Sequence, residues 1–383
     1  MDRATELNLI DELLNLKADK SAFLDEAVAR NDVEHYLSEE RFQQERDRIF
    51  RKRPLVAAHA SEMANAGDFL RREVAGQPVL LTRDRSGKVH AFLNVCRHRG
   101  TRLVDEEAGC RHRFACPYHA WTYSNEGQLI AAPHFEAGFG EIDKAELSLK
   151  ALTCIERFGF IWVVCDGASE REIDAHFEPV SEDLAALHMD EMVVVHQDVA
   201  IRRANWKILV EGGIEAYHFK IAHRTTIGPH FEDNLSSYQK MGAHIRSVLP
   251  RTSMAKLTED TRETWRLRDH AQVLYTLFPN AALLVQQDHI AWINQEAISA
   301  GETRVRLSTL IPKSEAHRTD HWKRNHKITS VTLEEDFVIG ESIQESIASG
   351  ANSHMLFGKF EGALHVFNQI VEGALAPEES LPE

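Results

Sequence analysis

Two pairs of potential metal ligands constrain the fold of this chain more than any other feature of its sequence. Cys96 and His98 form the first pair, and Cys116 and His119 form the second after an interval of 17 residues. Each pair lies on a loop beside a stretch that has the alternation and turn residues of a β-hairpin. The pattern predicts mostly short antiparallel strands across about residues 45–165.

The order of residue types within the two pairs argues against zinc. Zinc fingers group their ligands as a cysteine pair followed by a histidine pair, whereas each pair here holds one cysteine and one histidine. This arrangement suits a [2Fe–2S] cluster of the Rieske type, in which two cysteines bind one iron and two histidines bind the other. Structural zinc is the alternative. The remaining cysteines are expected to be small buried residues rather than ligands: Cys110, Cys154 and Cys165.

The rest of the chain mixes helices with strands. Residues 1–50 have helical spacing of their apolar residues. Beyond residue 166 we expect helices over about 170–188, 206–222 and 332–348, and strands over about 192–203, 243–250, 272–277, 281–286 and 302–311. Because these elements do not alternate strictly, they predict an antiparallel sheet with helices packed on it.

His218 and His223 are candidates for a second metal site. They are five residues apart, so on a regular helix they would point about 140° apart. They can share one metal only if the helix ends or bulges between them. Further along, Asp336 falls on an apolar helical face with Gly340 and Ile343. A carboxylate on such a face needs a partner, which is either a metal ion or an ordinary salt bridge.

These motifs resemble the α subunits of Rieske non-haem iron oxygenases, which include aromatic-ring-hydroxylating dioxygenases and choline and carnitine monooxygenases. The resemblance rests on the loops Asn94–Gly100 and Cys116–Trp121 and on Asn-Trp-Lys followed by Glu-x-Tyr-His within residues 205–223. It implies an α+β protein with an all-β Rieske [2Fe–2S] domain and a helix-grip (START-like) catalytic domain that has an antiparallel sheet and flanking helices. The implied domains are a helical segment packing on the catalytic domain, the Rieske domain and the mononuclear iron domain: residues 1–45, 46–165 and 166–383.

The resemblance also assigns roles to individual residues. Cys96, His98, Cys116 and His119 would bind the Rieske cluster, and His218, His223 and Asp336 would form the facial triad of a mononuclear Fe(II). Glu215 matches the carboxylate that links a Rieske histidine of one subunit to a mononuclear-site histidine of the next. Glu215 and Asp336 would therefore both be essential to catalysis.

Two positions depart from the usual family pattern. Most members have Asp where this chain has Glu215, and glutamate there resembles enzymes that act on quaternary ammonium compounds. Glu211 shares the same helical face and competes for the linking role. Gly212 stands where the family often has Asn, and the Gly212-Gly213 pair is expected to loosen the helix.

The implied function is that of a terminal oxygenase. It would take electrons from an NAD(P)H-dependent reductase, with or without a ferredoxin, and activate O2 to hydroxylate or demethylate a small aromatic compound or quaternary amine. A homotrimer is also implied. The alternatives are an electron carrier without oxygenase chemistry and a zinc-stabilised ligand-binding module. We expect the substrate pocket to be lined by Tyr217, Phe219 and the strands around Leu283, Val285 and Trp292.

Composition excludes several other classes of protein. The formal net charge of −15 argues against nucleic acid or an anionic membrane as partner. No run reaches the roughly 18–20 apolar residues of a membrane span, and the N-terminus has no apolar signal core. Five cysteines do not make a disulfide framework in a chain of 383 residues. We therefore expect a cytoplasmic protein, with a frayed acidic tail over residues 376–383.

Overall fold

The structure is a computed structural model that describes residues 1–376. These residues form two compact units: residues 50–175, and residues 1–49 together with 176–376. Apart from Ala376, the tail predicted to fray lies outside the described residues. No described helix combines the length and the apolar character needed to cross a membrane.

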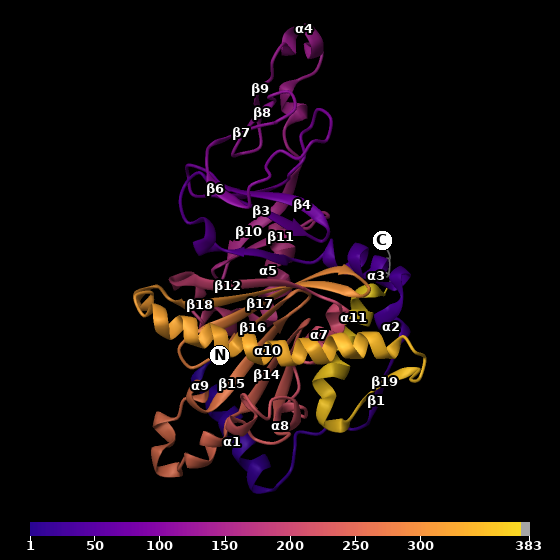
Figure 1. Ribbon diagram of the computed structural model, residues 1–383. Coiled ribbons are helices and arrows are strands. Elements are labelled where there is room, and N and C mark those ends of the chain that lie inside the picture. Colours follow the sequence, from indigo (N-terminus) through magenta and orange to yellow (C-terminus); the bar gives the residue numbers. More distant parts are fainter. Residues whose placement is uncertain (377–383) are drawn as a thin grey trace, which may run out of the picture. The chain divides into compact units, whose positions relative to one another are not determined.

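The unit of residues 50–175 is built from antiparallel strands (Figure 1). A seven-stranded sheet has the order β2-β11-β10-β5-β4-β3-β6, and a separate three-stranded sheet has the order β7-β8-β9. The bounds are β2 Leu55–His59, β3 Asp68–Val74, β4 Gln77–Arg83, β5 Val89–Leu93, β6 Ala108–Cys110, β7 Arg113–Ala115, β8 Thr122–Ser124, β9 Leu129–Ala131, β10 Ala151–Arg157 and β11 Phe160–Val164. The two predicted hairpins are β4–β5 and β8–β9, and a short helix, α4 (Phe135–Phe139), follows β9. The predicted all-β architecture of this region is confirmed.

The larger unit contains a second seven-stranded antiparallel sheet with the order β12-β18-β17-β16-β15-β14-β13. Its strands are β12 Met192–Arg202, β13 Ser237–Met241, β14 His244–Pro250, β15 Ala271–Leu277, β16 Ala281–Val285, β17 Ile290–Ser299 and β18 Glu302–Pro312. The long helix α10 (Thr319–Ile347) crosses this sheet and packs on β12 and β18 (Figure 1). The helices between β11 and α10 in the sequence are α5 Glu170–Phe177, α6 Ser181–Ala185, α7 Trp206–Glu211, α8 Phe219–Ala222 and α9 Leu267–His270. α5 begins in the smaller unit. This is the predicted α+β arrangement.

Two short strands, one from the N-terminal part of the chain and one from the C-terminal part, pair with each other in this larger unit. β1 (Ala29–Asp32) pairs antiparallel with β19 (His354–Phe357). The helices of these two parts are α1 Arg3–Ala18, α2 Glu34–Leu37, α3 Glu39–Glu45 and α11 Gly362–Leu375. A buried polar cluster joins them to α7: Glu45 accepts hydrogen bonds from Lys207 Nζ at 2.5 Å and Trp206 Nε1 at 2.8 Å. Such a pair is costly to break because either partner alone would be a buried charge.

Several predicted elements are interrupted or extended. The predicted helix over 206–222 is two short helices, because the chain leaves α7 at the Gly212-Gly213 pair. The predicted helix over 170–188 is divided into α5 and α6 by a short 3₁₀ segment that contains Pro179. The N-terminal 50 residues include β1 as well as helices, and the predicted strand ranges include neither β13 nor β17.

Candidate functional site

The four candidate cluster ligands are brought together in the smaller unit. Cys96 and His98 lie on the loop after β5, and Cys116 and His119 lie between β7 and β8. The Nδ1 atoms of His98 and His119 are 3.1 Å apart, and the thiols of Cys96 and Cys116 are within hydrogen-bonding reach of each other. Two adjacent thiols beside two adjacent imidazoles are the donor set that a Rieske cluster requires.

The surroundings of these four residues differ between the thiol side and the imidazole side. Both cysteines are buried, whereas His119 is exposed. Burial raises the pKa of the Cys116 thiol. The Tyr123 hydroxyl lies 3.5 Å from Cys96 Sγ and accepts a hydrogen bond from the Arg97 backbone N–H. Hydrogen bonds near cluster sulfurs tune the reduction potential, so Tyr123 is a residue of this site that the sequence pattern does not single out.

A Cys116→Ser variant is expected to fold without the cluster spectrum. A serine hydroxyl remains protonated near neutral pH and is a poor replacement for a thiolate ligand. Cys154→Ser is the matched control, because this partly buried cysteine lies on β10, outside the two ligand loops. Visible absorbance and electron paramagnetic resonance of the reduced protein provide the measurement. An unchanged spectrum in Cys116→Ser would contradict the assignment.

The mononuclear candidates depend on the break after α7. His218 is the N-cap of the single-turn helix α8, and His223 is its C-cap. The chain therefore stops being a regular helix at both histidines, as sharing one metal requires. Their Nε2 atoms lie 3.2 Å apart.

Asp336 completes the group from the middle of α10. Its Oδ1 lies 3.0 Å from His223 Nε2 and 3.4 Å from His218 Nε2. Ligands about 2.1 Å from one metal ion are about 3.0 to 3.4 Å apart when they subtend octahedral or tetrahedral angles. The three residues therefore fit a single ion, and two imidazoles with one carboxylate are the donor set of non-haem Fe(II) sites.

Each histidine also contacts a carboxylate through its other ring nitrogen. Glu215 Oε1 accepts from His218 Nδ1, and Glu335 Oε2 accepts from His223 Nδ1 at 2.8 Å. When Nδ1 carries the proton, the Nε2 lone pair is left to point at the shared centre. Carboxylates in this position orient metal-binding histidines and increase their basicity.

The electrostatics of the group reflect these contacts. Burial alone would lower the pKa of His218, but hydrogen bonds to Asp336 and Glu215 outweigh it and raise the pKa to about 10. Burial would raise the pKa of Asp336, but hydrogen bonds from the two histidines lower it. The carboxylate is thus held in its charged form, which binds a cation. His218, with its raised pKa, carries a proton on both ring nitrogens near neutral pH and must release the one on Nε2 when a metal ion binds.

Sequence reasoning missed Glu335. It precedes Asp336 on α10, and the two carboxylates contact opposite nitrogens of the His223 ring. Glu335 also accepts from Thr226 Oγ1 at 2.6 Å. The only feature of the sequence that could have indicated this role of Glu335 is its position next to Asp336, a candidate ligand.

Glu335→Gln is expected to weaken iron binding by about 10- to 100-fold, because the amide removes the charge that supports His223. Glu334→Gln is the matched control, since Glu334 is exposed and pairs with Arg202 instead. Competition with a calibrated iron(II) chelator measures the affinity. Equal affinities in the two variants would show that Glu335 does not support the metal.

The structure distinguishes Glu211 from Glu215. Glu211 Oε1 accepts from Tyr36 Oη and Asn368 Nδ2, both at 2.7 Å, and burial raises the pKa of Glu211 to about 7. The contact with His218 belongs to Glu215. Of the two glutamates, Glu215 contacts a histidine of the site, and Glu211 belongs to the buried cluster with Tyr36 and Asn368.

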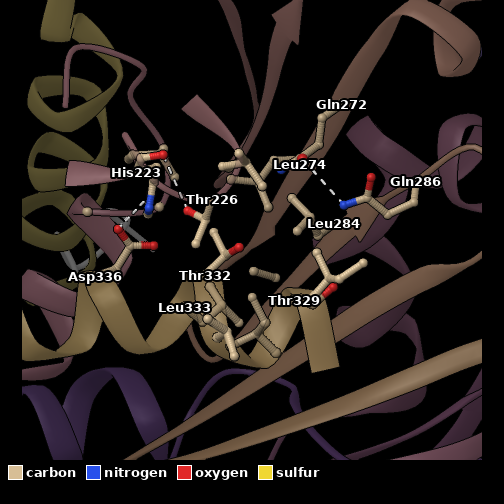
Figure 2. Close-up of a pocket in the computed structure, with 18 of the residues that line it drawn as sticks. His223, Thr226, Gln272, Leu274, Leu284, Gln286, Thr329, Thr332, Leu333 and Asp336 are labelled. Atoms are coloured by element: carbon tan, nitrogen blue, oxygen red, sulfur yellow. Dashed lines mark hydrogen bonds and ion pairs between the residues drawn. The ribbon is translucent and has the colours of Figure 1, made fainter. Parts of the chain in front are cut away.

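A cavity of about 730 Å³ opens beside His223 and Asp336. Figure 2 shows these two side chains at one end of it, with Leu274, Leu284 and Thr332 farther along. Phe219 and the strands around Leu283, Val285 and Trp292 line the cavity as predicted, whereas Tyr217 does not. The strands contribute the residues next to these three instead, including Ala282, Leu284 and Ile293, because successive side chains of a strand face opposite ways.

The remaining cysteines follow the prediction only in part. Cys165 is buried and Cys154 is partly buried, but Cys110 is exposed. Cys110 lies on the short edge strand β6, whose three residues are all exposed. The prediction of a buried residue is wrong there.

Two family models match this chain. The Rieske [2Fe–2S] domain matches residues 53–153. The catalytic domain of the ring hydroxylating alpha subunit matches residues 189–376. The four candidate cluster ligands lie within the first match, and His218, His223 and Asp336 lie within the second.

Curated relatives share about a third of their residues with the matched part. The glycine betaine monooxygenase oxygenase subunit of Pseudomonas aeruginosa is 34% identical over 188 residues, which cover 49% of this chain and 43% of the relative. The carnitine monooxygenase oxygenase subunit of Escherichia coli is 33% identical over 205 residues, or 52% of each protein. The chain thus spans about half the length of these relatives.

Solved structures extend the likeness to nearly the whole fold. A quaternary ammonium Rieske monooxygenase superposes with a TM-score of 0.78 at 22% identity, covering 91% of this chain and 96% of the other. With a Rieske domain and a ring-hydroxylating catalytic domain in one such fold, the chain belongs to the α subunits of the Rieske oxygenases.

Proposed function

We propose that this protein is the terminal component of an oxygenase that uses O2 to hydroxylate or demethylate a small organic molecule. The observation that carries the proposal is the second site. Two histidines and one aspartate converge on a single point at the end of a cavity. A Rieske-type electron carrier would need no such site, and a zinc-stabilised binding module would need neither site in this form.

The residues at the two sites would divide the work. Cys96, His98, Cys116 and His119 would hold the [2Fe–2S] cluster, and His218, His223 and Asp336 would hold mononuclear Fe(II). Bound iron supplies redox chemistry with O2 that zinc cannot, because zinc does not change its oxidation state.

The protein's own side chains prepare and enclose this site. Glu215 and Glu335 hold the two imidazole rings so that both Nε2 atoms face Asp336 Oδ1. Asp336 would hold the ion together with the two histidines and would neutralise part of its charge. Phe219, Leu274 and Leu284 provide apolar walls that bring the substrate beside this point and exclude water from it.

The partners follow from the same proposal. The electrons would come from an NAD(P)H-dependent reductase, with or without a ferredoxin, and the active form would be a homotrimer. In the trimer, Glu215 would connect His218 with His119 of the partner subunit. The family resemblance supports these assignments. The proposed location is the cytoplasm, because NAD(P)H is available there.

Coupled oxygen uptake tests the proposal. Purified protein that contains the cluster and the mononuclear iron is combined with a surrogate reductase and NADH. It is screened against aromatic acids and quaternary amines, and product is identified by mass spectrometry. Substrate-dependent O2 consumption with a hydroxylated or demethylated product is expected. Reduction of the cluster without product from any compound would favour the electron carrier, and protein containing zinc without iron would favour the binding module.

A further inference from the structure

The end of the cavity away from His223 and Asp336 is polar, and three strands build it. Arg251 follows the end of β14, Gln272 lies near the start of β15, and Gln286 follows the end of β16. These strands are neighbours in the antiparallel sheet, so the end of β14, the start of β15 and the end of β16 lie side by side and bring the three side chains together. All three line the cavity, and Figure 2 shows Gln272 and Gln286 across it from His223 and Asp336, with Leu274 and Leu284 between.

A chain of hydrogen bonds gives this end a direction. Arg251 Nη2 donates to Gln286 Oε1 at 2.7 Å, and Gln286 Nε2 donates to Gln272 Oε1 at 3.3 Å. A guanidinium can only donate, so it requires the Gln286 oxygen to face it and the Gln286 NH2 to face Gln272. The Gln272 NH2 is the end of this chain, and no described residue accepts a hydrogen bond from it. The Gln272 NH2 is therefore a hydrogen-bond donor that a ligand in the cavity can use.

The positive charge at this end has no anionic partner within the described residues. Arg251 forms no ion pair there, and its buried Nε has no acceptor. A second arginine, Arg268, donates from Nε to the backbone oxygen of Gln286 at 2.8 Å. Burial lowers the pKa of both guanidinium groups, as expected where a cation loses water without gaining a counter-ion.

The nearest carboxylate of the cavity wall is already engaged. Asp288 accepts from His289 Nδ1 and from His321 Nε2, each at 2.8 Å. Its charge attracts both arginines from a distance without pairing with either. The only other carboxylate among the described lining residues is Asp336, at the metal end.

The same wall is poorly suited to a cationic group. Its aromatic residues are Phe219, Phe231 and Phe337, with no Trp or Tyr among the described lining residues. The Phe231 ring is already covered by Arg251, whose Cζ lies 5.5 Å from the ring centroid. A quaternary ammonium group at this end would meet guanidinium charge rather than an aromatic cage.

We propose that Arg251 and Gln272 bind the carboxylate of an organic acid whose apolar body lies between Leu274 and Leu284 and whose reacting carbon faces His223 and Asp336. This proposal rests on the proposed oxygenase function and narrows its substrate class to carboxylates. A carboxylate would supply the missing counter-ion of Arg251 and accept from the free Gln272 NH2, which are charge-assisted hydrogen bonds. Since the charge of Arg251 and the Gln272 NH2 are otherwise left without partners among the described residues, a neutral analogue is disfavoured.

Calorimetric binding of three matched ligands tests this proposal without turnover. The ligands are 3-phenylpropanoate, its primary amide, and phenethyltrimethylammonium, each titrated anaerobically into the iron-loaded protein without reductase. The carboxylate is expected to bind at least about tenfold more tightly than the amide, the range expected for hydrogen bonds to a charged group. Equal or tighter binding of the amide or the ammonium compound, or no binding of the carboxylate, would overturn the proposal.

Variants assign the effect to residues. Arg251→Gln is expected to lose the preference for the carboxylate over the amide, while its affinity for the amide changes little. Gln272→Met is expected to lose part of the same preference. Arg266→Gln is the matched control, because Arg266 is an exposed arginine that does not line the cavity. If Arg251→Gln does not fold, an unchanged carboxylate preference in Gln272→Met overturns the proposal. Because these are binding measurements, an inactive protein that still prefers carboxylates would contradict only the oxygenase function.

Discussion

An Asp336→Ala variant is expected to keep its cluster and lose its mononuclear iron. Asp336 Oδ1 faces both His218 Nε2 and His223 Nε2, at 3.4 Å and 3.0 Å. Without it, two neutral imidazoles are left to bind a hard divalent ion that favours a carboxylate beside them. The cluster ligands lie in the other unit of the chain, so their iron should be unaffected.

Iron analysis together with visible spectroscopy measures this result. The variant should contain about two iron atoms per chain, the content of one [2Fe–2S] cluster, where the loaded wild-type protein contains about three. Glu334→Ala is the control, because it removes a carboxylate two residues away that is exposed and paired with Arg202. An iron content equal to that of the wild type in Asp336→Ala would assign the ligand role to another carboxylate, with Glu335 as the nearest.

The parts of the site that the sequence predicted are those determined by short-range spacing. Cys96-x-His98 and Cys116-x-x-His119 each occupy one loop, and the turn residues around them indicate the hairpins that present those loops. The geometric condition on His218 and His223 also follows from spacing alone, and the chain meets it with α8 between them. Whether these residues bind iron stays a prediction until metal is measured.

Glu335 could not be predicted in this way because its role depends on tertiary structure. On α10 it is about 100° around the helix from Asp336, so the apolar stripe that identifies one carboxylate excludes the other. Only the placement of the His223 ring between them gives both a partner. A sequence pattern has no information about that ring.

The strands that line the cavity were predicted, but the face that each strand turns toward it could not be, for a related reason. β16 is apolar throughout and buried at nearly every position, so its sequence has no alternation of polar and apolar residues that would distinguish its two faces. Leu283 and Leu284 are equivalent in composition, yet only Leu284 faces the cavity. The face is set by strand register, and a shift of one residue exchanges the two sets.

Glu215→Ala is expected to lose nearly all product formation even after added Fe(II) has refilled its mononuclear site. Removal of the carboxylate beside His218 should itself weaken iron binding about 10- to 100-fold, as at Glu335. Glu215 is buried, accepts from His218 Nδ1 and also accepts from the backbone N–H of Tyr217. It is thereby fixed in place at the histidine, as a group that links two sites must be. We expect its carboxylate also to accept a hydrogen bond from His119 of the partner subunit, so alanine would remove the connection between the two metal sites.

Comparison of substitutions at two glutamates separates this role from simple support of His218. Glu215→Gln keeps the length and one acceptor oxygen, so it should retain part of the activity, and Glu211→Gln should remain close to wild type because Glu211 bonds to Tyr36 and Asn368 instead. Product per chain is measured in a single turnover of pre-reduced protein, with iron content and trimer mass recorded for each variant. A product yield that returns to the wild-type value once added Fe(II) refills the mononuclear site of Glu215→Ala would reduce the role of Glu215 to orienting His218. A wild-type product yield in Glu215→Ala without added Fe(II) would show that Glu215 has no part in the reaction and that another group connects the two metal sites.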